Sequence, residues 1–147
     1  GRTVSLSGNT WKTAAVDYTV TEDTVLSFEA RVPSEGEIHA IGVESDGTWD
    51  NGNDLAFVLA GTQAESDRAS LNYDLHGTAD GAWQSYTIEL GQHYTGEISA
   101  LTFLNDHDVS SPTAEGAFRN ISLSDAPDPA TELGIVGQAQ ADIELLG

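Results

Sequence analysis

The chain has 147 residues, with 24 acidic against five basic side chains, a formal net charge of −19, and neither Cys nor Met. This length suits one domain, and a hydrophobic fraction of 39% excludes a compositionally disordered chain. The missing thiols exclude disulfides and thiolate chemistry, and the negative charge makes nucleic acid and anionic membrane poor partners because both would be repelled.

Alternating apolar and polar residues predict three strands in the first quarter of the chain, over residues 3–7, 11–20 and 25–32. Turn formers separate them at Gly8-Asn9, 21–24 and 33–36. A further strand is expected within 36–44, GEIHAIGVE, and a loop of turn formers follows at 46–54 with Trp49 in its middle.

The rest of the chain continues the same pattern of short strands and turns. We expect strands at 55–60, 83–90, 98–104 and 118–124, and a weaker one at 71–75. The turn at 91–96 carries His93 and Tyr94. About eight to ten short strands without helical periodicity predict an all-β, antiparallel β-sandwich that is jelly-roll-like.

We expect residues 1–125 to form this sandwich and residues 126–147 to be a linker or C-terminal tail. Ile143 and Leu145 alternate, so a short edge strand there is the alternative. The lack of an initiator Met and of a signal-peptide pattern predicts a mature or excised piece of a larger protein. No run approaches the ~18 apolar residues of a membrane span, and we expect a monomer with a solvated acidic surface that suits a salt-rich habitat.

Two predicted strands lead into carboxylates, which makes a calcium site the first candidate. Calcium takes six to eight oxygens from carboxylates, carbonyls and amides. The candidates are Glu37, Glu44 and Asp46 around the first strand, and Asn105, Asp106 and Asp108 at the end of the second. A second acidic cluster, Asp46, Asp50 and Asp54, lacks the EF-hand spacing, and a rim of solvated acids is the alternative. A zinc site of His39 and His107 is disfavoured because the two are far apart in the sequence.

A sugar site would need an exposed ring that stacks on the sugar and polar groups that bond its hydroxyls. Seven aromatic residues fall in strand patterns and are expected in the core: Tyr18, Phe28, Phe57, Trp83, Tyr86, Phe103 and Phe118. The candidate rings outside those patterns are Trp49, Tyr94, His93 and Trp11, although Trp49 could instead anchor its loop. Hydroxyl partners are expected from Gln63, Asn51 and Asn53, with Asn105 as a further candidate.

Five stretches taken together resemble a known type of module: 8–12 (GNTWK), 36–46 (GEIHAIGVESD), 60–63 (AGTQ), 83–96 (WQSYTIELGQHYTG) and 101–123 (LTFLNDHD…FRNISL). In these stretches the chain resembles β-sandwich carbohydrate-binding modules appended to secreted polysaccharide-degrading enzymes of marine and salt-loving microbes. The resemblance implies a secreted, non-catalytic module that binds a polysaccharide and shares a chain with a catalytic domain. It also favours a bound Ca²⁺ that is structural or bridges the ligand.

Catalysis is disfavoured on chemical grounds. A glycosidase needs a carboxylate pair, and in a chain with 24 acids such a pair carries no information. A lyase needs bases and cations, of which the chain has few, and no G-x-S-x-G, H-E-x-x-H or P-loop motif occurs. The charge favours a neutral glycan. The alternatives are a structural or adhesive domain of a cell-surface protein and, less favoured, a small polysaccharide lyase or hydrolase.

Overall fold

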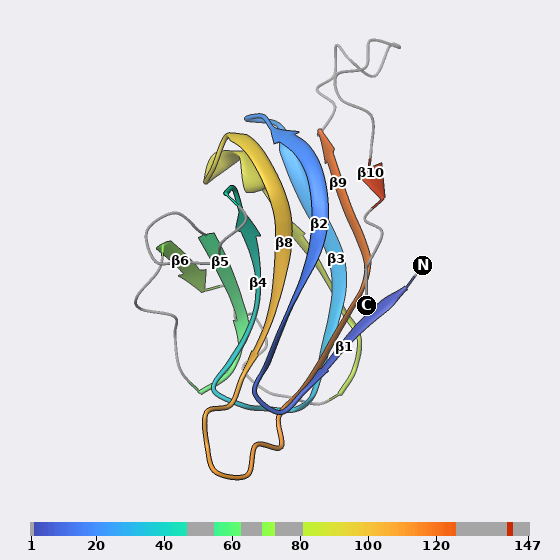
Figure 1. Cartoon of the computed structure of the whole chain (residues 1–147). Coiled ribbons are helices and arrows are strands. Elements are labelled where there is room, and N and C mark those ends of the chain that lie inside the picture. Colours follow the sequence, from blue (N-terminus) through green and yellow to red (C-terminus); the bar gives the residue numbers. More distant parts are fainter. Residues whose placement is uncertain (1, 47–54, 63–68, 73–80, 126–140, 143–147) are drawn as a thin grey trace.

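The chain folds into two β-sheets packed face to face, which confirms the predicted all-β sandwich (Figure 1). The computed structural model describes residues 2–46, 55–62, 69–72, 81–125 and 141–142, with backbone alone for 69–72 and 141–142. Sheet A has the strand order β1 (Thr3–Ser7), β9 (Glu115–Asp125), β3 (Thr24–Ser34) and β7 (Gln84–Ile88), and β10 (Ala141–Asp142) also pairs with β9. Sheet B has the order β2 (Thr10–Val20), β8 (Gly96–Asp106), β4 (Ile38–Glu44), β5 (Leu55–Ala60) and β6 (Ala69–Asn72).

Successive strands cross between the sheets, as expected for a jelly-roll-like sandwich. The chain passes from β1 in sheet A to β2 in sheet B, back to β3, and across again to β4. The pairings are antiparallel except that of β5 with β6, which is parallel. A short 3-10 turn, η1 (Leu90–Gln92), follows β7, which ends two residues before the end of the strand predicted at 83–90, and η1 overlaps the turn predicted at 91–96. Within the described ranges, no helix is both long and apolar enough to cross a membrane.

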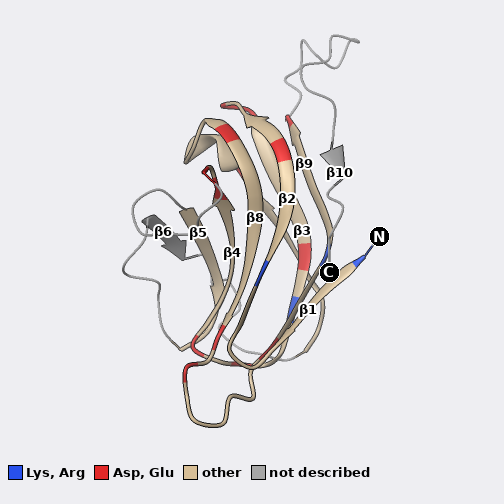
Figure 2. Cartoon of the chain, viewed as in Figure 1, with Lys and Arg blue, Asp and Glu red and all other residues tan. Residues whose placement is uncertain are grey.

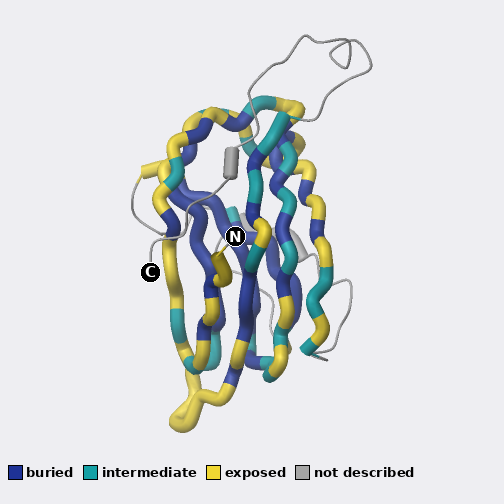
Figure 3. Tube along the Cα trace, turned by 90° about the vertical axis from the view of Figure 1, so that its right-hand side faces the viewer, coloured by how far each residue is buried: buried dark blue, intermediate teal, exposed yellow. Residues whose placement is uncertain are grey.

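The core lies between the sheets and is rich in aromatic rings. The Phe103 ring of sheet B lies 5.0 Å from the Phe118 ring of sheet A, and Phe118 in turn lies 6.0 Å from Phe28. Six of the seven aromatic residues predicted for the core are buried there, the exception being Trp83. Figure 3 shows the buried segments within the strands and the exposed turn after β8.

Strand β4 is buried over its whole length, on both faces. Ile41 and Val43 face the core between the sheets. Ile38 and Ala40 belong to a second, smaller cluster with Val58 and Leu104. Burial on both faces explains why this segment is mostly apolar and why its two polar exceptions, His39 and Glu44, need partners.

An irregularity in β9 decides which side chains face outward from sheet A. The β3–β9 register shifts by one residue between Ser27 and Glu29, and Asn120 within this bulge has φ 52°. Asn tolerates this left-handed conformation better than most residues. Because of the extra residue, Phe118 and Ile121 both point into the core although they are three positions apart.

The last residue of β9 is tied to both sheets. Asp125 accepts hydrogen bonds through Oδ1 from Thr24 Oγ1 at 2.8 Å and from the Tyr18 hydroxyl at 3.3 Å. Burial, together with the Asp125 charge, raises the pKa of Tyr18 to about 12, so the phenol stays a donor. Beyond Asp125 the described part of the predicted tail is β10, which pairs with β9 as an edge strand.

Candidate functional site

The five predicted metal ligands do not meet at one place. Strands β4 and β8 pair antiparallel, with Ile38 opposite Asp106 and Glu44 opposite Ala100. The carboxylates that follow the two strands therefore lie at opposite ends of the sheet, about 20 Å apart at 3.3 Å per residue over seven residues. The prediction that both acidic ends form one site is corrected by this pairing, which the sequence pattern alone does not fix.

One group of the predicted ligands lies at the end of the sandwich where β8 runs into its exposed turn. There the Glu37 backbone N–H donates to the Asp106 carbonyl at 2.8 Å, and Glu37 Oε2 accepts from the Asp108 N–H at 2.7 Å. These contacts attach the turn after β8 to the segment that precedes β4. At the other end Glu44 is only 4% exposed, and Thr102 Oγ1 lies 3.5 Å from its Oε2, while Asp46 follows at the surface.

No three His, Asp or Glu side chains in the described part of the chain are grouped so that they could hold a metal ion. Asp50 and Asp54 lie outside the described residues, as do four predicted sugar contacts, Trp49, Asn51, Asn53 and Gln63.

Asn105 and the two histidines of the disfavoured zinc site act as structural hydrogen-bonding groups. Asn105 is fully buried, and its Nδ2 donates to the Gly8 carbonyl at 2.7 Å and to the Ala114 carbonyl at 3.2 Å. The β4–β8 pairing brings His39 and His107 near one another, contrary to their distance in sequence. His39 Nε2 accepts from the Gly36 N–H at 2.8 Å, and His107 Nδ1 accepts from two backbone N–H groups at 3.0 and 3.1 Å.

The environment of His39 keeps its ring neutral. Burial lowers the pKa of His39 to about 4, the Asn105 side chain partly opposes this effect, and the nearby His107 adds to it. Since Nε2 accepts a bond, the proton of the neutral ring sits on Nδ1. His39 Nδ1 and Asn105 Oδ1 both lie against Gly116, where an added Cβ would sit 3.3 Å and 3.0 Å from them, so a larger residue there would have to displace these side chains by a few tenths of an ångström.

The three described aromatic candidates for sugar stacking lie in two separate places. Trp11 is 43% exposed, on β2 at an edge of sheet B. His93 and Tyr94 lie beside the turn that joins β2 to β3, where the Gln92 side chain bonds the Glu22 carbonyl. Tyr94 packs on the core, and its hydroxyl donates to the Glu97 carbonyl at 2.8 Å, which favours a structural role for this ring.

Trp83 was predicted to be a core residue, and the structure places it on the outer face of sheet A. Tyr86 and Ile88 point into the core, so Trp83, three residues before Tyr86, points the other way. The indole is half-buried and lies against two guanidinium groups. The Cζ atoms of Arg119 and Arg31 are 3.9 Å and 5.0 Å from its ring centroid. Counting the alternation back from Tyr86 would have revealed this placement.

The register of sheet A shows how these side chains come together. One row across the outer face contains Thr3, Arg119, Glu29 and Ser85, and the next contains Ser5, Ala117 and Arg31, with Trp83 two residues before Ser85. We call this surface the Trp83 face. Its residues come from four strands that are far apart in the sequence.

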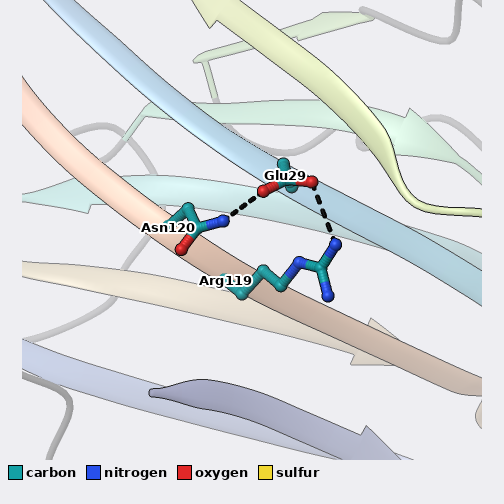
Figure 4. A network of polar contacts seen from close by, with 3 residues as sticks. All are labelled: Glu29, Arg119 and Asn120. Carbon is teal, nitrogen blue, oxygen red and sulfur yellow. Dashed lines mark hydrogen bonds and ion pairs between the residues drawn. The ribbon is translucent and has the colours of Figure 1, made fainter. Parts of the chain in front are cut away.

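Polar contacts hold one edge of the Trp83 face in place (Figure 4). Arg119 Nη2 lies 3.1 Å from Glu29 Oε1, and Asn120 Nδ2, from the bulge, donates to Glu29 Oε2. These hydrogen bonds lower the pKa of Glu29 below its usual value. Arg119 Nε is buried without a hydrogen-bond partner among the described residues, and the indole face beside the guanidinium compensates in part as a cation–π partner.

Two hollows adjoin Arg31. The first lies between the sheets, beside His39, Gln84 and Tyr86, and its volume of about 20 Å³ holds roughly one water molecule, far too little for a sugar ring. The second has a volume of about 230 Å³ on the outer side of sheet A and is lined by Arg31 and Pro33 of β3, residues 5–7 of β1 and residues 115–117 of β9. Ala117 is the small residue between Ser5 and Arg31 in its row, so the hollow is open.

Comparisons of the chain with protein-family models, curated proteins and solved structures find no match.

Proposed function

We propose that the protein is a non-catalytic carbohydrate-binding module that binds its glycan on the Trp83 face. The observation that carries this proposal is the half-buried Trp83, set among Arg31, Arg119, Glu29 and Asn120 on the outer face of sheet A. An indole offers a flat apolar surface to the C–H face of a sugar, and the surrounding groups offer donors and acceptors for its hydroxyls.

The support of this face by a sheet favours binding of an extended chain. Residues held by paired strands keep their positions without ligand, so little conformational entropy is lost on binding. The Glu29 contacts fix the Arg119 guanidinium beside the indole. A polysaccharide can lie along such an open face, whereas the cavity between the sheets is too small for one sugar unit.

In this proposal the module is secreted and linked to a catalytic domain of the same parent chain. Binding would hold that domain on the polysaccharide and raise the local concentration of substrate. In this proposal the acidic residues near the strand ends bind Ca²⁺, which either stabilises the fold or bridges the protein to its glycan. The competing function is that of a structural or adhesive domain without a sugar site.

Affinity gel electrophoresis against a panel of neutral and acidic polysaccharides tests the proposal, with each gel run in calcium and in EDTA. We expect retarded migration on at least one polysaccharide, and no release of reducing ends by the isolated chain. If migration is retarded in calcium but not in EDTA, glycan binding requires calcium. Unretarded migration on every polysaccharide in both conditions would refute the module and favour the adhesive domain.

A further inference from the structure

The cations of this acidic chain gather around one part of the sandwich. The four described basic residues, Arg2, Lys12, Arg31 and Arg119, lie at the start of β1 and on β2, β3 and β9 (Figure 2). Lys12 reaches from sheet B to the Ser5 carbonyl of β1 at 2.9 Å. The potential in this region depends mainly on the charges nearby, because charges farther than about 10 Å are largely screened at 0.1 M salt.

The 230 Å³ hollow lies within this region. Around it are three cations, Arg31, Lys12 and Arg119, and two carboxylates, Glu115 in the lining and Glu29 beside Arg119. The lining itself pairs one cation, Arg31, with one carboxylate, Glu115, so the hollow is close to neutral, against −19 for the chain. Glu29 is already engaged by Arg119, so the free cationic group at the hollow is that of Arg31.

Arg31 is placed to bind a ligand. Its side chain is exposed, and within the described residues its contact is the cation–π interaction with Trp83, without a hydrogen bond or ion pair. A guanidinium held against an aromatic ring keeps its N–H donors free at its edge, and these match the two oxygens of a carboxylate or sulfate. Ser5 and Ser7 lie across the hollow from it and supply hydroxyl groups.

We propose that this hollow binds an anionic sugar unit, one that carries a carboxylate or a sulfate ester. Arg31 hydrogen-bonds the anionic group, and the rest of the polysaccharide continues over Trp83. This inference rests on the proposed function and specifies its substrate class. It differs from the neutral glycan favoured by net charge, because the hollow offers a guanidinium with free N–H donors although the whole chain is strongly negative. Pockets for drug-sized ligands run to about 300–1,000 Å³, so 230 Å³ suits a single sugar unit.

The test is an NMR titration of the protein in EDTA with three matched monosaccharides: glucose, glucuronate and glucose 6-sulfate. EDTA removes calcium bridging, and comparison of the two acids distinguishes carboxylate from sulfate. We expect at least one acid to shift the amide signals of Ser5, Arg31 and Ala117 at concentrations where glucose does not. Arg31→Gln should weaken that binding about tenfold or more.

Two further variants separate a local effect from that of net charge. Glu115→Gln removes the exposed carboxylate of the hollow and should strengthen binding of the acid about twofold to threefold. The charge-matched controls are Thr95→Asp for Arg31→Gln and Glu97→Gln for Glu115→Gln, both at exposed positions at the other end of the sandwich. The controls should leave the affinity unchanged.

The outcomes distinguish this inference from the proposed function. Equal shifts by glucose and by both acids, no shifts at the hollow, or binding unaffected by Arg31→Gln would overturn the anionic sugar unit, and retention on a polysaccharide would still support the module. Absence of binding to every monosaccharide and polysaccharide would overturn both.

Discussion

Protonation of His39 should make folding strongly dependent on pH in the acidic range. The folded-state pKa of about 4 lies below the ordinary value of 6.5, so the unfolded chain binds the proton more tightly than the folded chain. The stability contributed by the neutral ring is complete above about pH 6.5 and is lost as pH falls towards 4. At 1.36 kcal/mol per pKa unit, the loss is about 3 kcal/mol.

The main physical reason is burial, which keeps the charged ring from water, and among the described residues no carboxylate acts on His39 to compensate. Its described surroundings are the Asn105 side chain, the His107 ring and the Gly36 N–H, which needs Nε2 as an acceptor. A proton on Nε2 would break this bond and leave the Gly36 donor facing a cation.

Urea unfolding of the wild type and of His39→Gln between pH 7 and pH 4 measures this effect. The variant retains an acceptor for the Gly36 N–H and loses the titrating ring. The free energy of unfolding should therefore fall by about 3 kcal/mol more in the wild type than in the variant over this range. His93→Gln, an exposed histidine, is the matched control and should behave as the wild type. Parallel stability curves for wild type and His39→Gln, or an NMR titration of His39 near 6.5, would refute the reasoning.

Other variants test the packing and the bulge, each by denaturant unfolding. Phe103→Ala should cost about 3–5 kcal/mol because it opens a cavity between the sheets, and a loss below about 1 kcal/mol would contradict the packing. Asn120→Val should destabilise by about 1–2 kcal/mol since φ is 52°, whereas Asn120→Gly should be much milder; equal losses would contradict the left-handed bulge. Tyr18→Phe removes the 3.3 Å bond to Asp125 and should cost about 1 kcal/mol, and an unchanged free energy of unfolding would show that the bond contributes nothing.

The strands and the core could be predicted from the sequence because both depend on local alternation. The strand predicted at 3–7 is found with the same bounds, and the inward positions of β3 follow the predicted Leu26, Phe28 and Ala30. The prediction that Trp83 lies in the core was wrong, because its aromatic character suggested burial while its position in the alternation places it on the outer face.

The site depends on which strands become neighbours, and local patterns do not contain that information. The Trp83 face combines β1, β3, β7 and β9, and it needs the bulge at Asn120 to bring two side chains to Glu29. The antiparallel pairing of β4 with β8 likewise separated carboxylates that looked similar in sequence. None of the residues on the Trp83 face was among the predicted sugar contacts, because their grouping depends on strand pairing.

A calorimetric titration of Trp83→Ala and Trp11→Ala with the best-retained polysaccharide tests the central claim most directly. Both variants remove an indole, and the two rings lie on different sheets. Binding on the Trp83 face predicts that Trp83→Ala lowers the affinity at least about tenfold, equivalent to 1.4 kcal/mol, while Trp11→Ala binds as the wild type. Full affinity in Trp83→Ala, with loss in Trp11→Ala, would contradict the account and place the glycan on sheet B.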